Sequence, residues 1–421
     1  MAPEARELRP LPVPTGGGAL LLPPLRRALA GEGPAVLPVP ADDPVTAERL
    51  VAALCAGPLT PAEHGADAAD GPTALVVATS GSTGEPKGVL LPAGALRASA
   101  EATHARLGGP GHWLLALPAW SVAGTQVLVR SLTAETEPVV MDTSGGFRPP
   151  GFAEAAAPLL ARAGRHYTSL VPTQLARLLA EGGSGLAALR AFDAVLLGGA
   201  ATPPALLDRA ESAGVRVVTT YGMSETSGGC VYDGVPLDGV RVRLADGAGG
   251  SAADGAAAPD GRVGRIELGG PVVARGYRGR ADLTAAAFGD PRDGWFRTSD
   301  LGRRGVNGRW EVLGRVDDLV NTGGVKVAPI LVERVLAAQP GVLEACVVGV
   351  PDPEWGQAVA AAVVPVDPAA PPSADALRGT VREQVGRAAT PKRVTFVRAL
   401  PLRGPGKVDR TAVRTLFAPS K

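Results

Sequence analysis

The stretch TSGSTGEPKGV at residues 79–89 carries more information than any other part of this chain. Its glycines, Gly88 included, allow tight turns that bring backbone N–H groups close to an anion, and its threonines and serines add hydroxyl donors. Lys87 adds a positive charge, and Pro86 prevents the segment from becoming a helix. The stretch therefore predicts a phosphate-binding loop formed by Thr79, Ser80, Gly81, Ser82, Thr83, Gly84 and Lys87.

Lysine is rare in this chain, which makes its positions informative. Only five of the 42 basic residues are lysines, and three of these lie in Gly-rich segments: Lys87 in GEPKG, Lys326 in NTGGVKV and Lys407 in RGPGKVDR. A lysine is a compact point charge that an arginine fork does not replace at a phosphate. We therefore expect functional roles for these three lysines and none for Lys392 and Lys421.

The composition is that of an ordinary globular protein. At 421 residues and 45% hydrophobic content, the chain should form two or three domains with a large core. A net charge of +1 and 4% aromatic residues provide neither a basic field nor a stacking platform for nucleic acid. The early apolar run GALLLPPL is interrupted by Pro23 and Pro24, so we expect neither a signal peptide nor a membrane span. Three scattered cysteines suit a reducing cytoplasm.

Short apolar runs alternate with helical patterns in the first part of the chain. ALVVAT precedes residues 79–89, YTSLVP precedes TQLARLLA, and AVLLGGA precedes TPPALLDRAESAG. This alternation is typical of α/β layers with largely parallel strands, whose C-terminal ends bind ligands. We therefore expect the α/β class, with a large N-terminal domain over residues 1–316.

The pattern changes towards the C-terminus. Between about residues 261 and 315, RVGRIELGGPVVARGY and DLGRRGVNGRWEVLGR read as strands with a hairpin turn at Asn307-Gly308, which predicts a small β subdomain. Beyond it, helical and strand patterns predict a smaller α+β domain over residues 317–421, with the boundary at Asp317-Asp318.

Six segments together resemble the acyl-adenylate-forming superfamily, which includes acyl- and aryl-CoA ligases, firefly luciferases and peptide-synthetase adenylation domains. Besides residues 79–89 they are LLGGAATP (196–203), TTYGMSETSGG (219–229), GWFRTSDLGR (294–303), LGRVDDLVNTGGVKVAP (313–329) and LPLRGPGKVDR (400–410). One such motif is a weak signal, whereas six in the family's order are specific. Residues 168–179 and 221–243 are most similar to the o-succinylbenzoate–CoA ligases of menaquinone biosynthesis.

The resemblance implies a ligase that uses ATP, Mg²⁺ and coenzyme A. A carboxylate attacks the α-phosphate of ATP to give an acyl-AMP, and the CoA thiolate then displaces AMP. By this resemblance Glu225 binds Mg²⁺, Thr226 lies near the α-phosphate, and Lys407 bridges the carboxylate and the α-phosphate. A helix-capping carboxylate is the alternative for Glu225, and a solvated lysine near the C-terminus is the alternative for Lys407.

The resemblance also implies an adenosine site and a mobile C-terminal lid. The adenosine residues come from three motifs: Gly198, Gly199, Ala200, Tyr221, Gly222, Met223, Ser224, Asp300 and Arg315. Asp300 and Arg315 are expected at the ribose and Tyr221 on the adenine. After adenylation the lid is expected to rotate about Asp317, so that Gly323 and Gly324 line a tunnel for the pantetheine of CoA, and Lys326 in the same segment is a further expected cofactor-binding residue.

The acid-binding residues are the least determined by the sequence. The loop Ser227, Gly228 and Gly229 continues directly from the adenosine motif. Thr173 and Arg177 belong to the helical pattern TQLARLLA, which is part of the segment most similar to the o-succinylbenzoate–CoA ligases. A dianionic acid needs donors for its second carboxylate. Gln174, Arg165 and His166 are further candidates, although each could be a plain surface or core residue.

One departure from the family pattern concerns the acid site. LPAWSVAG at residues 117–124 has Trp120-Ser121 where the family generally has an aromatic residue followed by histidine. His104, His112 and His166 cannot simply be assigned that role.

Three functions remain open at this point. The first is an acid–CoA ligase, with Lys326 and the absence of a carrier domain after Lys421 favouring free CoA. The second is a stand-alone adenylation enzyme that loads a carrier protein, or a ligase for another acid. The third is a non-catalytic nucleotide-binding module. We expect small-molecule partners only, no nucleic acid and a cytoplasmic location, with a homodimer left open.

Overall fold

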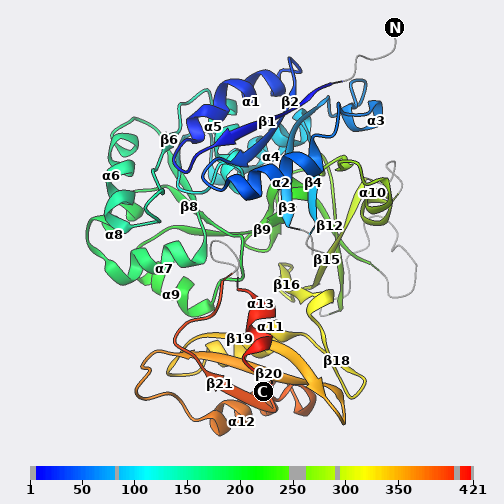
Figure 1. Ribbon diagram of the computed structural model, residues 1–421. Helices are drawn as coiled ribbons and strands as arrows, with labels where there is room; N and C mark the ends of the chain where they lie inside the picture. Colours follow the sequence, from blue (N-terminus) through cyan, green and yellow to red (C-terminus); the bar gives the residue numbers. More distant parts are fainter. Residues whose placement is uncertain (1–5, 81–84, 246–261, 290–293, 403–407, 419–421) are drawn as a thin grey trace. The chain divides into compact units, whose positions relative to one another are not determined.

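The structure is a computed structural model that describes residues 6–80, 85–245, 262–289, 294–402 and 408–418. The chain divides into two compact units (Figure 1). One comprises Met1–Gly199, Ala210–Arg243 and Glu267–Thr298, and the other comprises Ala200–Arg209, Leu244–Ile266 and Ser299–Lys421. The second unit includes residues before Asp317, and the expected domain boundary at Asp317 stays a prediction.

The first sheet of the first unit carries the expected phosphate-binding segment. Its strands β1, β2 and β3 are parallel, and β4 pairs antiparallel with β3 and with β14. Alternate apolar residues such as Leu37, Val39, Val76 and Leu90 pack against Leu54 of the neighbouring helix α2 (Pro44–Leu54). In order, the strands are β1 (Leu8–Val13), β2 (Ala35–Pro40), β3 (Thr73–Ser80), β4 (Pro86–Pro92) and β14 (Gly276–Tyr277).

The second sheet is mostly parallel, as the sequence predicts. Its strands β7 and β8 are buried along their whole length, as expected for parallel strands covered on both faces. The parallel strands are β6 (Val139–Val140), β5 (His112–Leu115), β7 (His166–Leu170), β8 (Ala194–Leu197) and β9 (Val217–Met223). The antiparallel strands β10 (Gly228–Tyr232) and β11 (Val235–Pro236) complete it.

The helices before residue 290 connect these strands. They are α1 (Leu22–Leu29), α2 (Pro44–Leu54), α3 (Pro61–His64), α4 (Ala93–Leu107), α5 (Val122–Thr133), α6 (Pro149–Leu160), α7 (Pro172–Glu181), α8 (Gly183–Arg190), α9 (Pro204–Ser212) and α10 (Ala281–Phe288). Several begin with proline in the first turn, where a missing N–H costs nothing.

The third sheet contains the expected β subdomain, with one correction. Its order is β12 (Arg241–Ala245), β13 (Val263–Gly269), β15 (Trp295–Arg304) and β16 (Trp310–Arg315). The predicted turn is confirmed, since Gly308 has a φ of +75° between β15 and β16. However, the segment PVVARGY does not extend this sheet, because its strand β14 pairs with β4 and the helix α10 follows.

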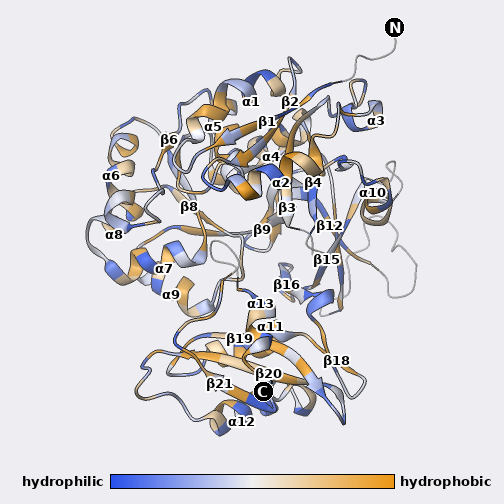
Figure 2. Ribbon diagram, viewed as in Figure 1, coloured by the Kyte–Doolittle hydropathy of each residue, from blue (hydrophilic) through white to orange (hydrophobic). Residues whose placement is uncertain are grey.

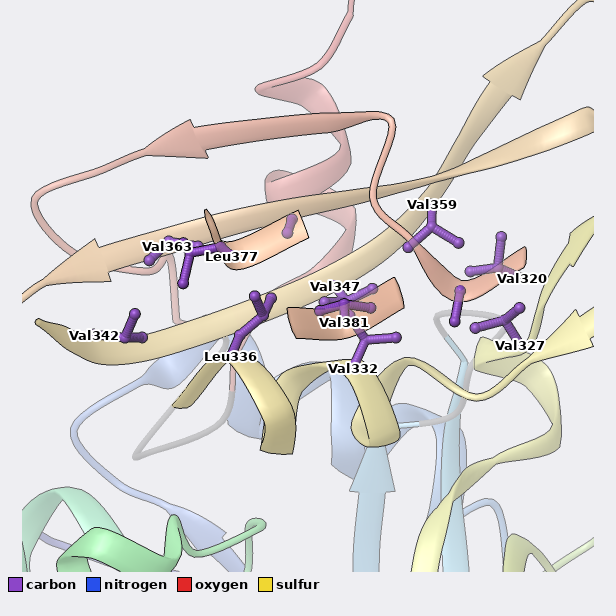
Figure 3. Close-up of a cluster of buried hydrophobic side chains, with 12 residues drawn as sticks. Val320, Val327, Val332, Leu336, Val342, Val347, Val359, Val363, Leu377 and Val381 are labelled. Atoms are coloured by element: carbon purple, nitrogen blue, oxygen red, sulfur yellow. The ribbon is translucent and has the colours of Figure 1, made fainter. Parts of the chain in front are cut away.

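The fourth sheet belongs to the second unit, and both of its faces are buried. Figure 2 shows apolar residues along β19 and β20. One face packs Val347, Val359 and Val363 against the helices α11 (Pro329–Ala337) and α12 (Ala374–Gln384) (Figure 3). The other face packs against Val413 of α13 (Arg410–Thr415). The order is β18 (Val325–Val327), β17 (Val320–Thr322), β20 (Gly356–Pro365) and β19 (Val342–Asp352), and β21 (Arg393–Phe396) pairs with β20.

Candidate active site

The expected phosphate-binding segment forms an antiparallel hairpin between β3 and β4. Thr79 pairs with Lys87 and Ser80 with Pro86, and the Thr79 hydroxyl donates to the Lys87 carbonyl at 3.4 Å. Gly81, Ser82, Thr83 and Gly84 lie outside the described residues. The hairpin places Lys87 in the second of its residue pairs, counted from the described end of the two strands.

Gly88 has a different role from the one expected. It is a buried residue of β4 and not a turn residue. A Cβ at this position would lie 2.9 Å from methyl groups of both Leu54 and Val76. The close packing of β4 against α2 therefore explains why glycine is needed at position 88.

The motif YGMSETSGG forms the turn between β9 and β10. Gly222 pairs with Gly229, and a Cβ on Gly222 would overlap the Gly228 carbonyl. The buried Thr226 hydroxyl accepts a hydrogen bond from the Met223 N–H at 3.0 Å and lies 2.8 Å from the Gly228 carbonyl oxygen. In this conformation the hydroxyl proton and one lone pair are used within the turn, and the expected role of Thr226 near the α-phosphate stays a prediction.

The loop that follows is held by hydrogen bonds from other elements. Ser227 is fully buried with a φ of +52°, and its hydroxyl donates to the Val272 carbonyl at 2.9 Å. The Ser99 hydroxyl of α4 donates to the Ser227 carbonyl at 3.1 Å. Gly228 has a φ of +97°, and a Cβ there would lie 3.3 Å from the Gln126 side chain of α5. The acid-binding loop expected at residues 227–229 therefore faces α5.

Glu225 is partly buried in the short 3₁₀ turn Ser224–Thr226, and its carboxylate does not cap a helix. Its Oε1 accepts a hydrogen bond from the Tyr277 hydroxyl at 2.8 Å. Burial, with the Glu225 charge as the next cause, raises the pKa of Tyr277, so this hydroxyl keeps its proton. The Lys87 ammonium lies 5.5 Å from the centre of the Tyr277 ring. Tyr277 thus connects the expected metal ligand with the expected phosphate-binding lysine.

The expected adenine-binding residues lie at the C-terminal end of β8 and along β9. A Cβ at Gly198 would overlap the Thr220 hydroxyl, and Gly199 has a φ of +81°. Ala200 follows the end of the strand and is partly buried. Tyr221, Gly222 and Met223 are partly buried residues of β9, and Ser224, which follows them, is buried. The strand order places these two segments next to each other, as the motif assignment requires.

The two expected ribose contacts are neighbours in the second unit. Asp300 of β15 pairs directly with Arg315 of β16. The Arg315 guanidinium also donates to the Asp317 carboxylate at 3.1 Å, just inside the 3₁₀ turn Val316–Asp318 where we expect the hinge. The ribose role of this pair and the hinge role of Asp317 stay predictions.

A buried arginine that the sequence analysis did not single out lies on α5. Arg130 is 3% exposed, and its guanidinium donates to the Tyr232 hydroxyl at 3.3 Å and lies 4.9 Å from the Trp113 ring. Among the described residues it has no carboxylate partner, and its Nε has no hydrogen-bond partner. Burial lowers the pKa of Arg130, yet an arginine stays charged at neutral pH.

Other polar atoms around Arg130 are also unpaired in the described part of the chain. Gln126, one turn earlier on α5, has a free Oε1, and His104 of α4 has a free Nε2. Burial and then the charge of Arg130 lower the pKa of His104 to about 4, so the imidazole is neutral. The buried stripe of Gln126, Arg130 and His104 therefore combines one cation with unused hydrogen-bonding groups.

Ser121 occupies the position where the family generally has histidine, and it caps α5. Its hydroxyl donates to the Pro118 carbonyl at 2.8 Å and accepts from the Gly124 N–H at 3.1 Å. The serine therefore starts the helix that carries Gln126 and Arg130.

The candidate acid-binding residues on α7 make hydrogen bonds mainly with backbone groups of the protein. Gln174 is buried, and its amide accepts from the Val171 N–H and donates to the Ala116 carbonyl. Arg177 donates to the Phe147 carbonyl at 3.3 Å, and Thr173 is partly buried. Arg165 precedes β7 and thus lies at the opposite end of this strand from the motif loops. The substrate roles of Thr173 and Arg177 stay predictions.

The expected CoA-binding residues form a two-residue hairpin turn between β17 and β18. Gly323 and Gly324 have φ values of +56° and +82°, as such a turn requires. Nothing lies within 4 Å of a Cβ placed on Gly324. Lys326 is exposed and has no ion pair with any described residue.

Lys392 and Arg410 stabilise the second unit. Lys392 forms an ion pair with Asp352 at 2.8 Å and lies 4.2 Å from the Trp355 ring. Arg410 forms ion pairs with Glu333 and Asp318, of which Glu333 is buried. Lys407 lies outside the described residues, while Leu402 and Val408, which precede and follow residues 403–407, form an isolated antiparallel bridge.

The described residues contain neither a ready-made metal cluster nor a membrane-spanning helix. No cluster of three or more His, Cys, Asp or Glu residues is arranged there to hold a metal. None of the helices in that part of the chain has the length and apolar character that a membrane crossing requires. A single carboxylate such as Glu225 fits Mg²⁺, which is commonly bound by one or two carboxylates together with substrate phosphates.

Comparisons with known proteins agree with the motif analysis. Residues 30–278 match the AMP-binding enzyme family, and residues 331–407 match the AMP-binding enzyme C-terminal domain. A probable 2-succinylbenzoate–CoA ligase of Mycobacterium tuberculosis is 46% identical over 98% of this chain and 99% of its own length. A 2-succinylbenzoate–CoA ligase of Geobacillus kaustophilus is 34% identical over 82% of this chain and 69% of its own length.

Solved structures show the same relationship. The o-succinylbenzoate–CoA synthetase of Bacillus subtilis, in complex with its acyl-adenylate intermediate, matches with a TM-score of 0.68 and 28% identity over 83% of this chain and 69% of that chain. The same enzyme with ATP and a magnesium ion matches with a TM-score of 0.66 and 29% identity, over 80% of this chain and 69% of that chain. These matches confirm the expected fold class and the resemblance drawn from the six motifs. The chain belongs to the AMP-binding enzyme family.

Proposed function

We propose that this protein is an ATP- and Mg²⁺-dependent acid–CoA ligase whose acid is 2-succinylbenzoate, converted to its CoA thioester for menaquinone biosynthesis. The relatives with that name support the proposal, and 2-succinylbenzoate carries two carboxylates of which only one is activated. The second carboxylate must be neutralised inside the protein, because an unpaired buried carboxylate is prohibitively costly.

The observation that carries the proposal is the buried Arg130, which has no acidic partner among the described residues. A buried cation without an anion is costly in the free protein, and a ligand carboxylate would remove that cost. Arg130 lies on the same helix as Gln126, whose side chain approaches Gly228 of the acid-binding loop. A benzoate or a fatty acid would leave the guanidinium unpaired.

The first step joins two anions, so the residues need to stabilise charge more than to transfer protons. We assign Lys87 to the ATP phosphates, Glu225 to the metal and Lys407 to the reacting carboxylate and α-phosphate. Mg²⁺, when bound, screens the phosphate charge. The proposed location is the cytoplasm, and the mass in solution would test a homodimer.

The test compares kcat/KM for 2-succinylbenzoate and benzoate in the wild type, Arg130→Met and a control, Arg190→Ala. Arg190 is an exposed arginine that donates to the Ala213 carbonyl. We expect Arg130→Met to reduce kcat/KM for 2-succinylbenzoate by about 10²-fold or more, the equivalent of about 3 kcal/mol for a lost charged hydrogen-bond partner. Benzoate, a poor substrate throughout, should be affected little.

Two results would contradict the proposal. If the wild type uses benzoate or a medium-chain fatty acid as well as 2-succinylbenzoate, the assigned acid is wrong and the adenylating mechanism survives. If Arg177→Ala, and not Arg130→Met, removes the preference, the second carboxylate is bound at α7. The alternative of a carrier protein as acceptor is excluded if AMP release depends on free CoA.

A further inference from the structure

The segment Arg275–Arg278, which carries β14, is held unusually firmly against the first sheet. Its backbone N–H groups at Arg275 and Arg278 donate to the carbonyls of Leu90 and Gly88 at 2.9 and 2.8 Å. Tyr277 lies between these two anchors and pairs with Val89, two residues beyond Lys87. The backbone of Tyr277 is therefore fixed relative to the strand that carries the phosphate-binding lysine.

Two arginine side chains fix the segment from the outside. Arg275 donates to the carbonyls of His64 and Gly71 and forms an ion pair with Asp70. Arg278 donates to the carbonyls of Leu54 and Gly57 and forms an ion pair with the largely buried Glu63. Both guanidinium groups are thus occupied within the protein, and their contacts hold the chain on either side of Tyr277.

The Tyr277 side chain lies close to two opposite charges. Its hydroxyl donates to Oε1 of Glu225 at 2.8 Å, and the Lys87 ammonium lies 5.5 Å from its ring centre. Phe288 packs edge-on against the ring at 5.5 Å. Within the described residues, no ion pair joins Lys87 to Glu225, and Tyr277 is the only side chain that hydrogen-bonds the Glu225 carboxylate.

A phenol suits this position because it is a neutral hydrogen-bond donor. It orients a carboxylate without cancelling its negative charge, whereas a lysine or arginine would compete with a metal ion for it. The aromatic face attracts the ammonium without neutralising it. One side chain can thus hold the carboxylate for a metal and the lysine for phosphates while preventing the two from pairing with each other.

We propose that Tyr277 is a positioning residue for the adenylation step, which orients Glu225 towards the metal of the bound nucleotide and keeps Lys87 from forming an ion pair with Glu225. This inference rests on the proposed function, since it presumes that Glu225 serves Mg²⁺ and Lys87 serves ATP. It extends that function to a residue outside the six motifs.

The test measures metal and nucleotide binding without any turnover. Mn²⁺, whose free form is quantified by electron paramagnetic resonance, is titrated into the protein with saturating α,β-methylene-ATP. We expect Tyr277→Phe to weaken Mn²⁺ binding about 10-fold, as is usual for the loss of a hydrogen bond to a metal-binding carboxylate. The Mg²⁺ concentration that half-activates pyrophosphate release should rise by a similar factor, with little change at saturating Mg²⁺.

A second variant separates the two parts of the proposal. Tyr277→Leu removes the ring as well, so Lys87 can approach Glu225. The affinity for α,β-methylene-ATP, measured in excess chelator so that no metal is bound, should therefore fall several-fold more in Tyr277→Leu than in Tyr277→Phe. The control is Tyr167→Phe, which removes a tyrosine hydroxyl that donates to the carbonyls of Leu107 and Gly109, before β5. It should leave the Mn²⁺ affinity unchanged.

Unchanged Mn²⁺ affinity in Tyr277→Phe overturns the inference, as does an equal loss of activity at every Mg²⁺ concentration, which indicates a merely structural hydroxyl. The binding measurement uses neither acid nor CoA, so an error in the assigned acid leaves it standing. If the wild type binds no analogue, the proposed function fails and this inference fails with it.

Discussion

Two glycine-rich hairpins of this molecule have similar sequences and opposite surroundings. In the β9–β10 turn, the Thr226 hydroxyl is used internally, Ser227 is fully buried, and Gly222 leaves no space for a Cβ. In the β17–β18 turn, Gly324 has nothing within 4 Å of a Cβ, and Lys326 is exposed.

The difference shows how to separate structural from functional residues. Where a neighbouring carbonyl leaves no space for a Cβ, the fold itself requires glycine, whether or not the residue also binds a ligand. An exposed lysine that makes no ion pair with a described residue contributes little to folding, so a loss of activity on its removal is easier to attribute to a ligand. Substitutions of glycine and lysine residues in the two units can test whether this contrast holds.

The largest expected effect is that of Lys407→Ala, in the second unit. We expect acyl-AMP formation to slow by about 10²–10³-fold, the loss typical of one preorganised charge-stabilising group. Pyrophosphate release from ATP and acid measures this step, and AMP release from supplied acyl-AMP and CoA measures the second one, which should be nearly unaffected. Lys392→Ala, which removes an ion pair with Asp352, is the matched control. Equal losses in both steps would refute the assignment of Lys407.

The glycines of the two hairpins should respond differently to alanine. Gly222→Ala forces a methyl group onto the Gly228 carbonyl, so we expect the free energy of unfolding to fall by about 1–3 kcal/mol and both reaction steps to suffer. Gly324→Ala costs about 1 kcal/mol of backbone strain and should slow only the CoA step. Denaturant unfolding and the two assays above give these quantities.

Gly356→Ala is the control for Gly324→Ala. Gly356 also has a positive φ, +73°, and open space around its Cβ. The two variants should therefore lose equal stability, and only Gly324→Ala should slow transfer to CoA. If Gly356→Ala slows it as much, strain in the second unit explains the effect and the CoA role of Gly324 is wrong.

The smallest effect concerns the pH dependence of stability in the first unit. The pKa of His104 is lowered to about 4 in the folded protein, against about 6.5 when unfolded. Below pH 6.5 the unfolded chain therefore binds a proton that the folded protein does not, and stability falls as the pH decreases towards 4. Between pH 6 and pH 5 this group should cost about 1 kcal/mol, a loss that His104→Leu removes. Parallel curves for the wild type and variant would contradict the assignment.

Local patterns in the sequence predicted much of the fold. The alternation of apolar runs and helical patterns identified β7, α7, β8 and α9, because each is formed by contiguous residues. The glycine signals located the turn at Gly308, which requires a positive φ. The motif order brought Glu225 and Asp300 into consideration because their types and spacing are specific.

Non-local contacts explain what the sequence did not predict. Strand β14 has only two residues and joins β4, which is far away in the sequence, so no local pattern could place Tyr277 beside Glu225. The only local sign of a fixed Tyr277 was that arginines flank this aromatic residue in the segment ARGYRGR. The sequence analysis missed Arg130 because the burial of a charged residue depends on packing between α5, α4 and β10. The single cation in the apolar run VLVRSL was the one local indication that this arginine is buried.

The bridge between Leu402 and Val408 has a consequence for the timing of catalysis. Lys407 is covalently joined to Val408, and Arg410 ties the next turn of the chain to Glu333 and Asp318. The described residues Val408 and Arg410 are therefore held to the second unit, and a large displacement of this segment requires movement of the whole unit, on the microsecond to millisecond scale. A step limited by such a movement is slowed by solvent friction, so sucrose or glycerol in the buffer would reduce the rate of adenylation even though neither touches the reacting atoms.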